Sequence, residues 1–248
     1  MSRVKNNTTN TNSGHLTKFK EFLASEECFQ CPTRDIALFA NMQPEDLIEM
    51  HSPIRYEEID KGELLYAHDQ QAAFLYTLHD GVVKLEQSLP TGEKRIVRLL
   101  RRGDLAGIEA VTASDYQHDA IAMTKISVCK IPAGLVLESS RKSQELHSNL
   151  LNKWQQALTT SDTWLTKLST GPSRYRVIRL LIWLAEHSPD QEFYMPGRED
   201  IGYMLALTTE TVSRTVASLR RDGDVELVGS DRACADVAKL KKIVKERA

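Results

Sequence analysis

The segment from Arg198 to Arg214 constrains the fold of this 248-residue chain more than any other part of it. Apolar residues recur there at helical spacing on both sides of a short break at residues 206–208, which predicts two helices joined by a tight turn. Gly202 is small enough for the helices to cross closely, and Thr208 can accept a hydrogen bond from the amides that begin the second helix. The outer face of that helix carries groups that can bond to base edges in a DNA major groove: Thr209, Glu210, Ser213 and Arg214.

This pattern predicts a helix-turn-helix whose second helix reads DNA. The alternative is an ordinary helical hairpin with a solvated polar face. The agreement of spacing, small residue, cap and base-reading side chains favours the DNA reader. One residue is unusual, because Ala206 stands in the turn where glycine is common. A left-handed backbone at an alanine costs about 1–2 kcal/mol.

Composition describes a protein that folds in water. Apolar residues make up 41% of the chain and charged residues 27%, as in ordinary globular proteins. The best apolar run, residues 177–185, is too short to span a membrane and is broken by Arg179. The N-terminus shows no signal peptide, so we expect a cytoplasmic protein with no membrane contact. The net charge is −2, but positive charge gathers near the predicted reading helix at Arg214, Arg220 and Arg221, which suits phosphates as well as bases.

Changes in composition and in hydrophobic pattern divide the chain into four parts. Residues 1–26 form a polar, low-complexity tail that we expect to be disordered. Residues 27–142 form the second part, in which short apolar runs alternate with turn signals over about 52–131 and predict a small β-barrel or sandwich of the jelly-roll type. Residues 143–170 lack Gly and Pro and predict one long helix, and residues 171–248 hold the helix-turn-helix. The expected fold class is therefore α+β. The strand candidates of the barrel are residues 64–66, 74–78, 82–85, 95–99 and 126–131, and in the last part a helix is expected at 174–187 and a β-wing near 224–232.

The long helix carries a seven-residue repeat. Two interleaved sets form an a/d seam over about three heptads: Leu151, Leu158 and Leu165, with Trp154, Ser161 and Leu168 three residues after each. The alternative is a single amphipathic helix packed on its own domain. A helix of this length after a compact barrel favours pairing with a second copy, and we expect a parallel homodimer.

The order of barrel, long helix and C-terminal helix-turn-helix resembles the CRP/FNR family of bacterial transcription regulators, in its FNR/FixK-like branch. The resemblance covers nearly the whole chain after the polar tail, and Glu210-Thr-Val-Ser-Arg214 matches the family's E-x-x-S-R reading signature. It implies that Glu210, Ser213 and Arg214 contact bases, since arginine can fork onto guanine and glutamate can accept from cytosine. In the FNR branch this triplet accompanies palindromes of the TTGAT-N4-ATCAA type, read by a two-fold dimer that contacts RNA polymerase.

The barrel lacks the phosphate clamp of the relatives that bind cyclic AMP. Those relatives use a glycine-glutamate pair followed by Arg-Ser/Thr. Here residues 103–110 have glycine turns in another order, and His118-Asp119 stands at the Arg-Ser/Thr position. A carboxylate that faces a phosphate is repulsive, so we do not expect cyclic AMP as a ligand.

The cysteines indicate a different signal. Cys28-Phe-Gln-Cys31 lies just before the barrel and Cys129 near its end, as in FNR-like oxygen sensors. The resemblance implies a four-iron, four-sulfur cluster held by these three residues. The third N-terminal cysteine of the family is missing, because its two usual positions are Ala37 and Phe39. An oxygen ligand could complete the set, and the candidates are Glu26, Glu27 and Asp35.

Two interpretations of the sensor stay open. With a cluster, the protein responds to oxygen or redox state. Without one, it is a cluster-free FixK-like regulator that is controlled by its abundance or by thiol oxidation. The Cys28-x-x-Cys31 spacing also fits a zinc site or a redox pair. Cys234 belongs to the DNA-binding part, and the seven histidines show no ligand spacing to one another, so we expect them to be surface or core residues.

The sequence lacks the motifs that other functional classes would require. No nucleophile elbow, phosphate loop, pair of catalytic carboxylates or zinc-protease motif is present in the sequence, so we do not expect an enzyme. A cyclic-nucleotide-binding module that signals through protein contacts is disfavoured by the missing clamp. The leading interpretation is a dimeric regulator that binds double-stranded DNA and RNA polymerase and responds to oxygen or redox state.

Overall fold

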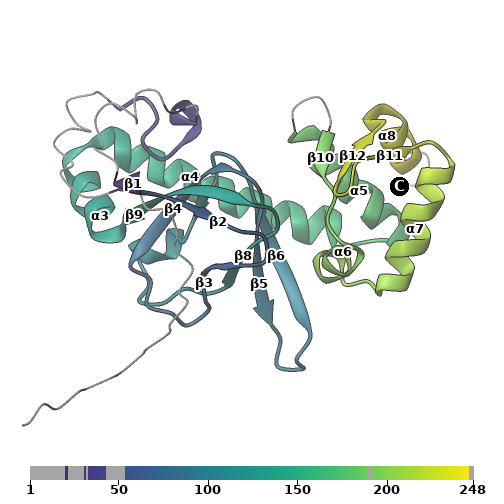
Figure 1. Cartoon of the computed structure of the whole chain (residues 1–248), viewed down its shortest axis with the longest axis horizontal. Helices are drawn as coiled ribbons and strands as arrows, with labels where there is room; N and C mark the ends of the chain where they lie inside the picture. Colours follow the sequence, from purple (N-terminus) through teal and green to yellow (C-terminus); the bar gives the residue numbers. More distant parts are fainter. Residues whose placement is uncertain (1–19, 22–30, 32, 43–53, 189–191, 246–248) are drawn as a thin grey trace, which may run out of the picture.

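Two bodies joined by one long helix form the structure (Figure 1). A β-barrel is formed by strands between Arg55 and Pro132 together with a short strand at Lys20–Glu21, and a helical domain with a small sheet begins at Ser173. This arrangement confirms the expected α+β fold. The computed structural model describes residues 20–21, 31, 33–42, 54–188 and 192–245. The expected N-terminal tail, residues 1–26, lies almost entirely outside these residues.

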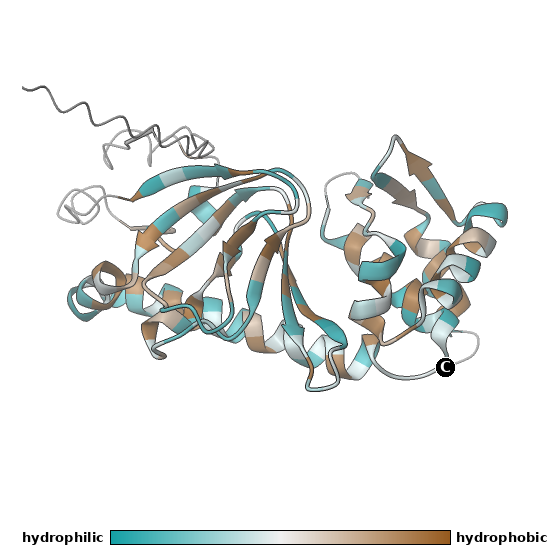
Figure 2. Ribbon diagram, turned by 60° about the horizontal axis from the view of Figure 1, so that its bottom comes forward, coloured by the Kyte–Doolittle hydropathy of each residue, from teal (hydrophilic) through white to brown (hydrophobic). Residues whose placement is uncertain are grey.

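The barrel consists of two antiparallel sheets. Its strands are β1 (Lys20–Glu21), β2 (Arg55–Ile59), β3 (Leu64–Tyr66), β4 (Phe74–Asp80), β5 (Val83–Ser88), β6 (Lys94–Leu100), β7 (Leu105–Ala106), β8 (Asp119–Ala122) and β9 (Ile126–Pro132). One sheet has the order β1-β2-β9-β4-β7 and the other β3-β8-β5-β6. Hydrophobic and hydrophilic residues alternate along the strands (Figure 2), so each sheet turns an apolar side to the shared core.

Five of these strands, β3 to β6 and β9, fall where the sequence predicts them. The sequence does not predict β2, because Arg55, Glu57 and Glu58 interrupt its apolar pattern. Neighbouring β9 and the turn before it supply the opposite charges, with Lys130 at 3.3 Å from Glu57 and Lys125 at 2.8 Å from Glu58. Strand β8 is short, and β7 has two residues only, which is too little for a pattern.

The connection between the bodies is helical. Helix α3 (Ala133–Lys142) is followed by α4 (Gln144–Thr163), which continues directly into a π-helical turn, η3 (Trp164–Leu168). The hydroxyl oxygen of Ser143 caps α4 by accepting from the Leu146 amide at 3.3 Å. Leu146 and Leu150 are buried against the barrel core, so α4 packs on its own domain with one face.

The C-terminal domain contains four helices and a three-stranded sheet among its described residues. The helices are α5 (Ser173–Glu186), α6 (Arg198–Leu205), α7 (Thr209–Arg221) and α8 (Val237–Lys245), and the strands are β10 (Glu192–Tyr194), β11 (Val225–Val228) and β12 (Arg232–Ala235). The sheet order is β10-β12-β11, and all pairs are antiparallel. The hairpin β11–β12 confirms the expected wing, whereas β10 and α8 are not predicted by the sequence.

The turn between α6 and α7 has the close geometry that its residues indicate. A Cβ at Gly202 would lie 2.7 Å from the Leu207 carbonyl oxygen, so only glycine fits there without a shift. The Thr208 hydroxyl oxygen accepts from the Thr211 amide at 3.3 Å and caps α7. Ala206 has φ +53°, which confirms a left-handed backbone at an alanine. The helix-turn-helix is therefore built with strain at this one residue.

We expect Ala206→Gly to stabilise the protein by about 1 kcal/mol, because glycine adopts a left-handed backbone without a Cβ clash. Urea unfolding at equilibrium measures the difference. Ala217→Gly is the matched control, since Ala217 is an exposed residue inside α7 with an ordinary helical environment. That control should lose about 1 kcal/mol. Equal losses in both variants would show that Ala206 is not strained.

Candidate nucleic-acid interface and thiol site

Helix α7 separates an apolar inner side from a polar outer side. Val212, Val216 and Leu219 are fully buried and fix the rotation of the helix about its axis. The predicted reading residues then lie on the outer side: Thr209, Glu210, Arg214 and Arg220 are exposed, and Ser213 is half-buried. Glu210 and Arg214 are one turn apart, with 3.7 Å between Oε1 and Nη2. The structure thus brings all five predicted reading residues onto one helix and leaves four of them open to solvent.

A groove follows the outer side of α7 toward the wing. Its lining residues are Arg214, Ala217, Arg220, Arg221, Gly223, Val225, Glu226 and Leu227. Three arginines against one glutamate give this groove a positive character. Burial and the nearby charge of Arg220 lower the pKa of Arg198, which begins α6. Such crowding of guanidinium groups is relieved by phosphate oxygens.

Helix α5 holds the turn and the reading helix in place. The Arg176 guanidinium donates to the carbonyl oxygen of the left-handed Ala206 at 3.3 Å. Arg174 donates to the Ser218 hydroxyl at 3.0 Å and lies 3.6 Å from Asp222 at the end of α7. The two arginines therefore attach the turn and the C-terminal end of α7 to α5.

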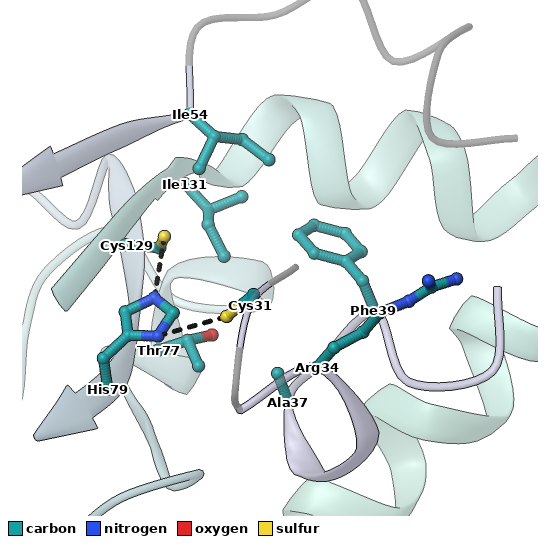
Figure 3. A pocket seen from close by; sticks show the side chains of 9 residues that line it. All are labelled: Cys31, Arg34, Ala37, Phe39, Ile54, Thr77, His79, Cys129 and Ile131. Carbon is teal, nitrogen blue, oxygen red and sulfur yellow. Dashed lines mark hydrogen bonds between the residues drawn. The ribbon is translucent and has the colours of Figure 1, made fainter. Parts of the chain in front are cut away.

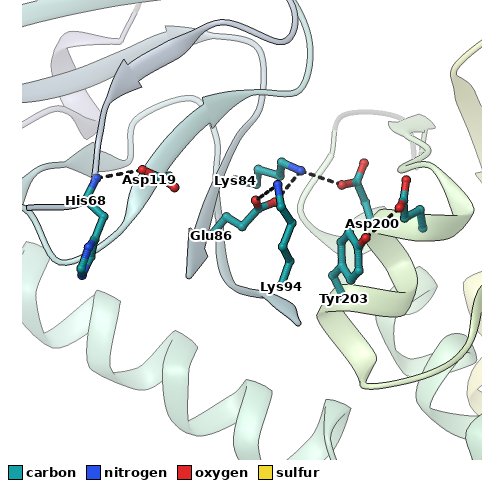
Figure 4. Close-up of polar contacts among 8 residues, drawn as sticks. His68, Lys84, Glu86, Lys94, Asp119, Asp200 and Tyr203 are labelled. Carbon is teal, nitrogen blue, oxygen red and sulfur yellow. Dashed lines mark hydrogen bonds and ion pairs between the residues drawn. The ribbon is translucent and has the colours of Figure 1, made fainter. Parts of the chain in front are cut away.

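An ion-pair network joins the barrel to the first helix of the helix-turn-helix (Figure 4). Lys84 Nζ lies 2.9 Å from Asp200 Oδ1 on α6 and 2.8 Å from Glu86 Oε2. Lys94 Nζ lies 2.7 Å from the other oxygen of Glu86, whose side chain is 2% exposed. Burial alone would raise the pKa of Glu86, but the two lysines more than offset it and lower this pKa. Ile96, Leu99 and Met123 of the barrel share an apolar core with the C-terminal domain, so the two bodies are packed together.

The second site of interest is a pair of thiols on either side of His79 (Figure 3). His79 Nε2 lies 2.9 Å from Cys129 Sγ, and Nδ1 lies 3.4 Å from Cys31 Sγ. The Thr33 hydroxyl approaches Nδ1 to 2.6 Å and Cys31 Sγ to 3.0 Å. Burial, with a smaller contribution from Arg102, lowers the pKa of His79. A neutral imidazole has one donor and one acceptor nitrogen, so it can bond to both sides at once.

The sequence does not point to His79, because it lies 48 residues from Cys31 and 50 from Cys129, and only the pairing of β4 with β9 brings it there. Ala37 and Phe39, where the family carries its third cysteine, line the same pocket. Asp35 is exposed and does not line it. Cys28, Glu26 and Glu27 lie outside the described residues. Cys234 is on β12 of the other domain.

The described part of this site does not fit an iron–sulfur cluster. The His79 ring occupies the space between the two sulfurs, and the pocket beside it measures about 40 Å³. Its other lining residues are mostly apolar, among them Ala37, Phe39 and Ile131. No group of three or more His, Cys, Asp or Glu side chains in the described residues is arranged to hold a metal ion. As described, the site is a thiol–imidazole–thiol contact.

Tyrosines stack in the barrel interior beside the turn at Gly107. The rings of Tyr66 and Tyr116 stack with centroids 3.9 Å apart, and Tyr76 lies 5.8 Å from Tyr66. The Tyr66 hydroxyl accepts from the Gly107 amide at 3.0 Å, and burial keeps the pKa of Tyr66 well above its usual value. Gly107 has φ +69°, and a Cβ there would lie 2.8 Å from the Phe74 carbonyl oxygen. The glycine turn at Gly107 is therefore packed closely against protein.

The residues of the seam expected on the long helix lie in two environments: some are exposed to solvent, and others pack in the chain's own cores. Leu151, Leu158 and Leu165 are more than half exposed and form an apolar row with no partner among the described residues. Trp154 is half-buried against the barrel core. Leu168 is only 1% exposed and lies in the core of the C-terminal domain. Leu168 is therefore covered by its own chain, whereas the three exposed leucines are the seam residues that stay open to a second copy.

Comparison with known proteins gives two family matches along the chain. The cyclic nucleotide-binding domain family matches residues 56–141, and the Crp-like helix-turn-helix domain family matches residues 175–243. The first covers the barrel and most of α3, and the second covers the helix-turn-helix and wing. In the described residues, no helix is long and apolar enough to cross a membrane.

Individual relatives span most of the chain. The transcriptional activator protein FnrL of Cereibacter sphaeroides is 26% identical over 212 residues, which cover 82% of this chain and 85% of that protein. The nitrogen fixation regulation protein FixK of Bradyrhizobium diazoefficiens is 25% identical over 223 residues, with 87% and 93% coverage. The structure of FixK2 from Bradyrhizobium japonicum superposes with a TM-score of 0.69 at 22% identity, over 75% of this chain and 95% of that one, and shares the fold. A CRP-family transcriptional regulator from Thermus thermophilus gives a TM-score of 0.65 at 25% identity, with 76% and 96% coverage.

Proposed function

Since the chain belongs to the CRP/FNR family of transcription regulators and is not an enzyme, we propose that it acts as a homodimer that reads a TTGAT-N4-ATCAA-like palindrome. The observation that carries this proposal is the outward face of α7, where Glu210, Ser213 and Arg214 stand together beside a positive groove. RNA polymerase is the protein partner that such a regulator contacts at promoters.

The assignment of roles follows from chemistry. Arg214 is 73% exposed and carries five donors, so it can fork onto the two acceptors of guanine. Glu210 is an acceptor only and suits the amino group of cytosine. The weak contact between the two side chains keeps both near the same base pairs and is easily exchanged for DNA. Thr209 and Arg220, at the two ends of the exposed face, are proposed to contact the flanking backbone or bases.

We expect Arg214→Ala to weaken binding to the palindrome by about 1–3 kcal/mol and to relax preference at the guanine position. Glu210→Ala should change preference more than affinity. Titration of DNA duplexes that differ at single half-site positions measures both effects. Arg141→Ala, an exposed arginine on α3, is the control for loss of one positive charge and should bind as the parent does. If the Arg214 and Glu210 variants also bind every duplex as the parent does, this face is not the reader.

The exposed row of leucines on α4 and η3 supports a homodimer. Leu151, Leu158 and Leu165 repeat every seven residues, so they stay on one side of the helix. Three leucines exposed in one line are unfavourable in water, and a second copy of the same helix can cover them symmetrically. A two-fold dimer also places two reading helices on two half-sites, as a palindrome requires.

We expect Leu158→Glu to yield a monomer, because a carboxylate in the apolar row would be desolvated without a partner. Sedimentation measures the oligomeric state, and DNA binding should fall far more than helical content. Leu89→Glu is the matched control, since Leu89 is an exposed leucine at the turn after β5 and should leave the dimer intact. A dimeric Leu158→Glu protein would contradict a seam at this row.

The thiol site supports a response to oxygen or redox state. Two half-buried thiols contact the same imidazole, and one of them, Cys31, comes from the segment ahead of the barrel. Oxidation of either sulfur would break its contact with His79 and change how that segment packs on the barrel. This favours control by thiol oxidation. An iron–sulfur cluster held by Cys28, Cys31 and Cys129 stays a prediction, because the described residues supply no metal-binding set.

We expect oxidation in air to change the DNA affinity of the parent and of Cys234→Ser, but not of Cys129→Ser, which lacks one of the two thiols. DNA titrations with reduced and air-exposed protein measure this. Iron content and the visible spectrum of anaerobically purified protein separate the two chemistries. A chromophore that Cys28→Ser and Cys129→Ser each abolish indicates a cluster, and colourless protein indicates thiols alone. Parent protein that binds equally in both states would contradict redox control.

A further inference from the structure

A polar cleft of about 260 Å³ lies where the barrel, the long helix and the C-terminal domain meet. The end of β6 and the turn after it form one wall, α4 forms the second, and the end of α5 forms the third. The residues that carry its chemistry are Arg98, Arg101, Asp104, Lys153, Trp183 and His187. The cleft is thus bounded by the barrel, the long helix and the C-terminal domain together.

Positive charge in this cleft exceeds negative charge. Arg98, Arg101 and Lys153 face it, and Asp104 is the one carboxylate among its described lining residues. The Arg98 Nε is buried and has no hydrogen-bond partner among the described residues. A buried guanidinium donor without a partner is costly, and native proteins seldom leave one unpaired.

The other two cations are also poorly neutralised. The Arg101 guanidinium stacks 4.0 Å above the Trp183 ring and donates to the His187 carbonyl oxygen at 3.4 Å. Burial lowers the pKa of Arg101 to about 10, and Asp104 offsets only part of this. Lys153 donates to the carbonyl oxygens of Ile36 and Gly103, and burial lowers its pKa as well. Neutral carbonyl groups therefore hold charges that lack enough counter-charge.

We propose that this cleft binds a small dianion, of the dicarboxylate or phosphate type, between Arg98, Arg101 and Lys153. The charge of such a ligand matches the excess of two positive charges, and its oxygens give Arg98 the acceptor that the protein does not. A volume of about 260 Å³ suits a ligand of a few heavy atoms and is small for a nucleotide.

The cleft is separate from the nucleotide pocket of the barrel family. The tyrosines Tyr66, Tyr76 and Tyr116 and the turn at Gly107 do not line it. The proposed dimer seam also lies elsewhere on α4. At about 100° per residue, Lys153, Gln156 and Thr160 lie about 140–200° around the helix axis from Leu151. A second copy that covers the leucine row therefore leaves the cleft open to a ligand.

Occupancy of the cleft has a structural consequence. A dianion that contacts Arg98 and Arg101 on the barrel and Lys153 on α4 strengthens packing at the point where α5 meets both. Since α5 holds the helix-turn-helix through Arg174 and Arg176, the ligand would favour one orientation of the reading helix. This regulatory step rests on the proposed function, whereas binding of the dianion does not.

Isothermal titration of the full-length dimer with sodium succinate, and separately with inorganic phosphate, tests the site at constant ionic strength. We expect one of the two to bind with a Kd between about 10 μM and 1 mM, which also identifies the chemical type. Arg98→Gln and Arg101→Gln should each weaken binding at least tenfold. Arg141→Gln on the exposed side of α3 removes the same charge elsewhere and should bind as the parent does.

Thermal unfolding of the same proteins shows whether a variant has simply failed to fold. Without dianion, Arg98→Gln should melt at the parent's temperature or higher, because a buried Nε donor without a partner is gone. With dianion, the parent should gain stability and Arg98→Gln should not. No binding of either probe at about 10 mM, or equal binding by parent and both cleft variants, overturns the proposal. Binding that leaves DNA affinity unchanged supports the site and overturns the regulatory step.

Discussion

Helix α4 presents three different faces to its surroundings, and the arrangement of the rest of the molecule depends on how these faces are oriented. Leu146 and Leu150 enter the barrel core, which fixes the rotation of the helix. That rotation leaves the leucine row of Leu151, Leu158 and Leu165 outside and turns Lys153 toward the cleft. Since a helix is rigid over this length, a change in any one of these packings is felt along the others. The barrel, the dimer seam and the C-terminal domain are thereby connected through one element.

The barrel also contacts the helix-turn-helix directly, through its hairpin β5–β6 and helix α6. The hairpin β5–β6 offers α6 both apolar surface, at Ile96 and Leu99, and the Lys84 ammonium, which also pairs with the buried Glu86 carboxylate. A partly buried ion pair that is shared by two domains is sensitive to small displacements, because separation leaves charge without its partner. Lys84 contacts Glu86 and Asp200 together, so the position of the barrel hairpin and the position of α6 are set by one side chain. A signal that shifts the hairpin would reach the helix-turn-helix through this contact.

Local sequence patterns predict the helix-turn-helix well, because its geometry is determined within about twenty residues. Gly202, Ala206 and Thr208 each have one structural role in the turn, and each role follows from the residue type. The heptad repeat on α4 is also visible in the sequence, but its partners are not. Sequence spacing cannot separate the leucines that face a second copy from Trp154 and Leu168, which face the chain's own cores. That distinction depends on where the barrel and the C-terminal domain pack, which is tertiary information.

The thiol site also depends on tertiary contacts that sequence spacing does not reveal. Spacing identifies Cys31 and Cys129, and the missing family cysteine is visible as Ala37 or Phe39. His79 becomes part of the site only through the register of β4 against β9, which pairs the residues on either side of it with Ser127 and Val128. Its imidazole then occupies the space between the sulfurs and contacts both. Ala37 and Phe39 thus stand at the two positions where a third N-terminal cysteine was expected, and His79 contacts the two thiols that the structure describes. A neutral imidazole has one donor and one acceptor nitrogen, so this one side chain can satisfy both thiols at once.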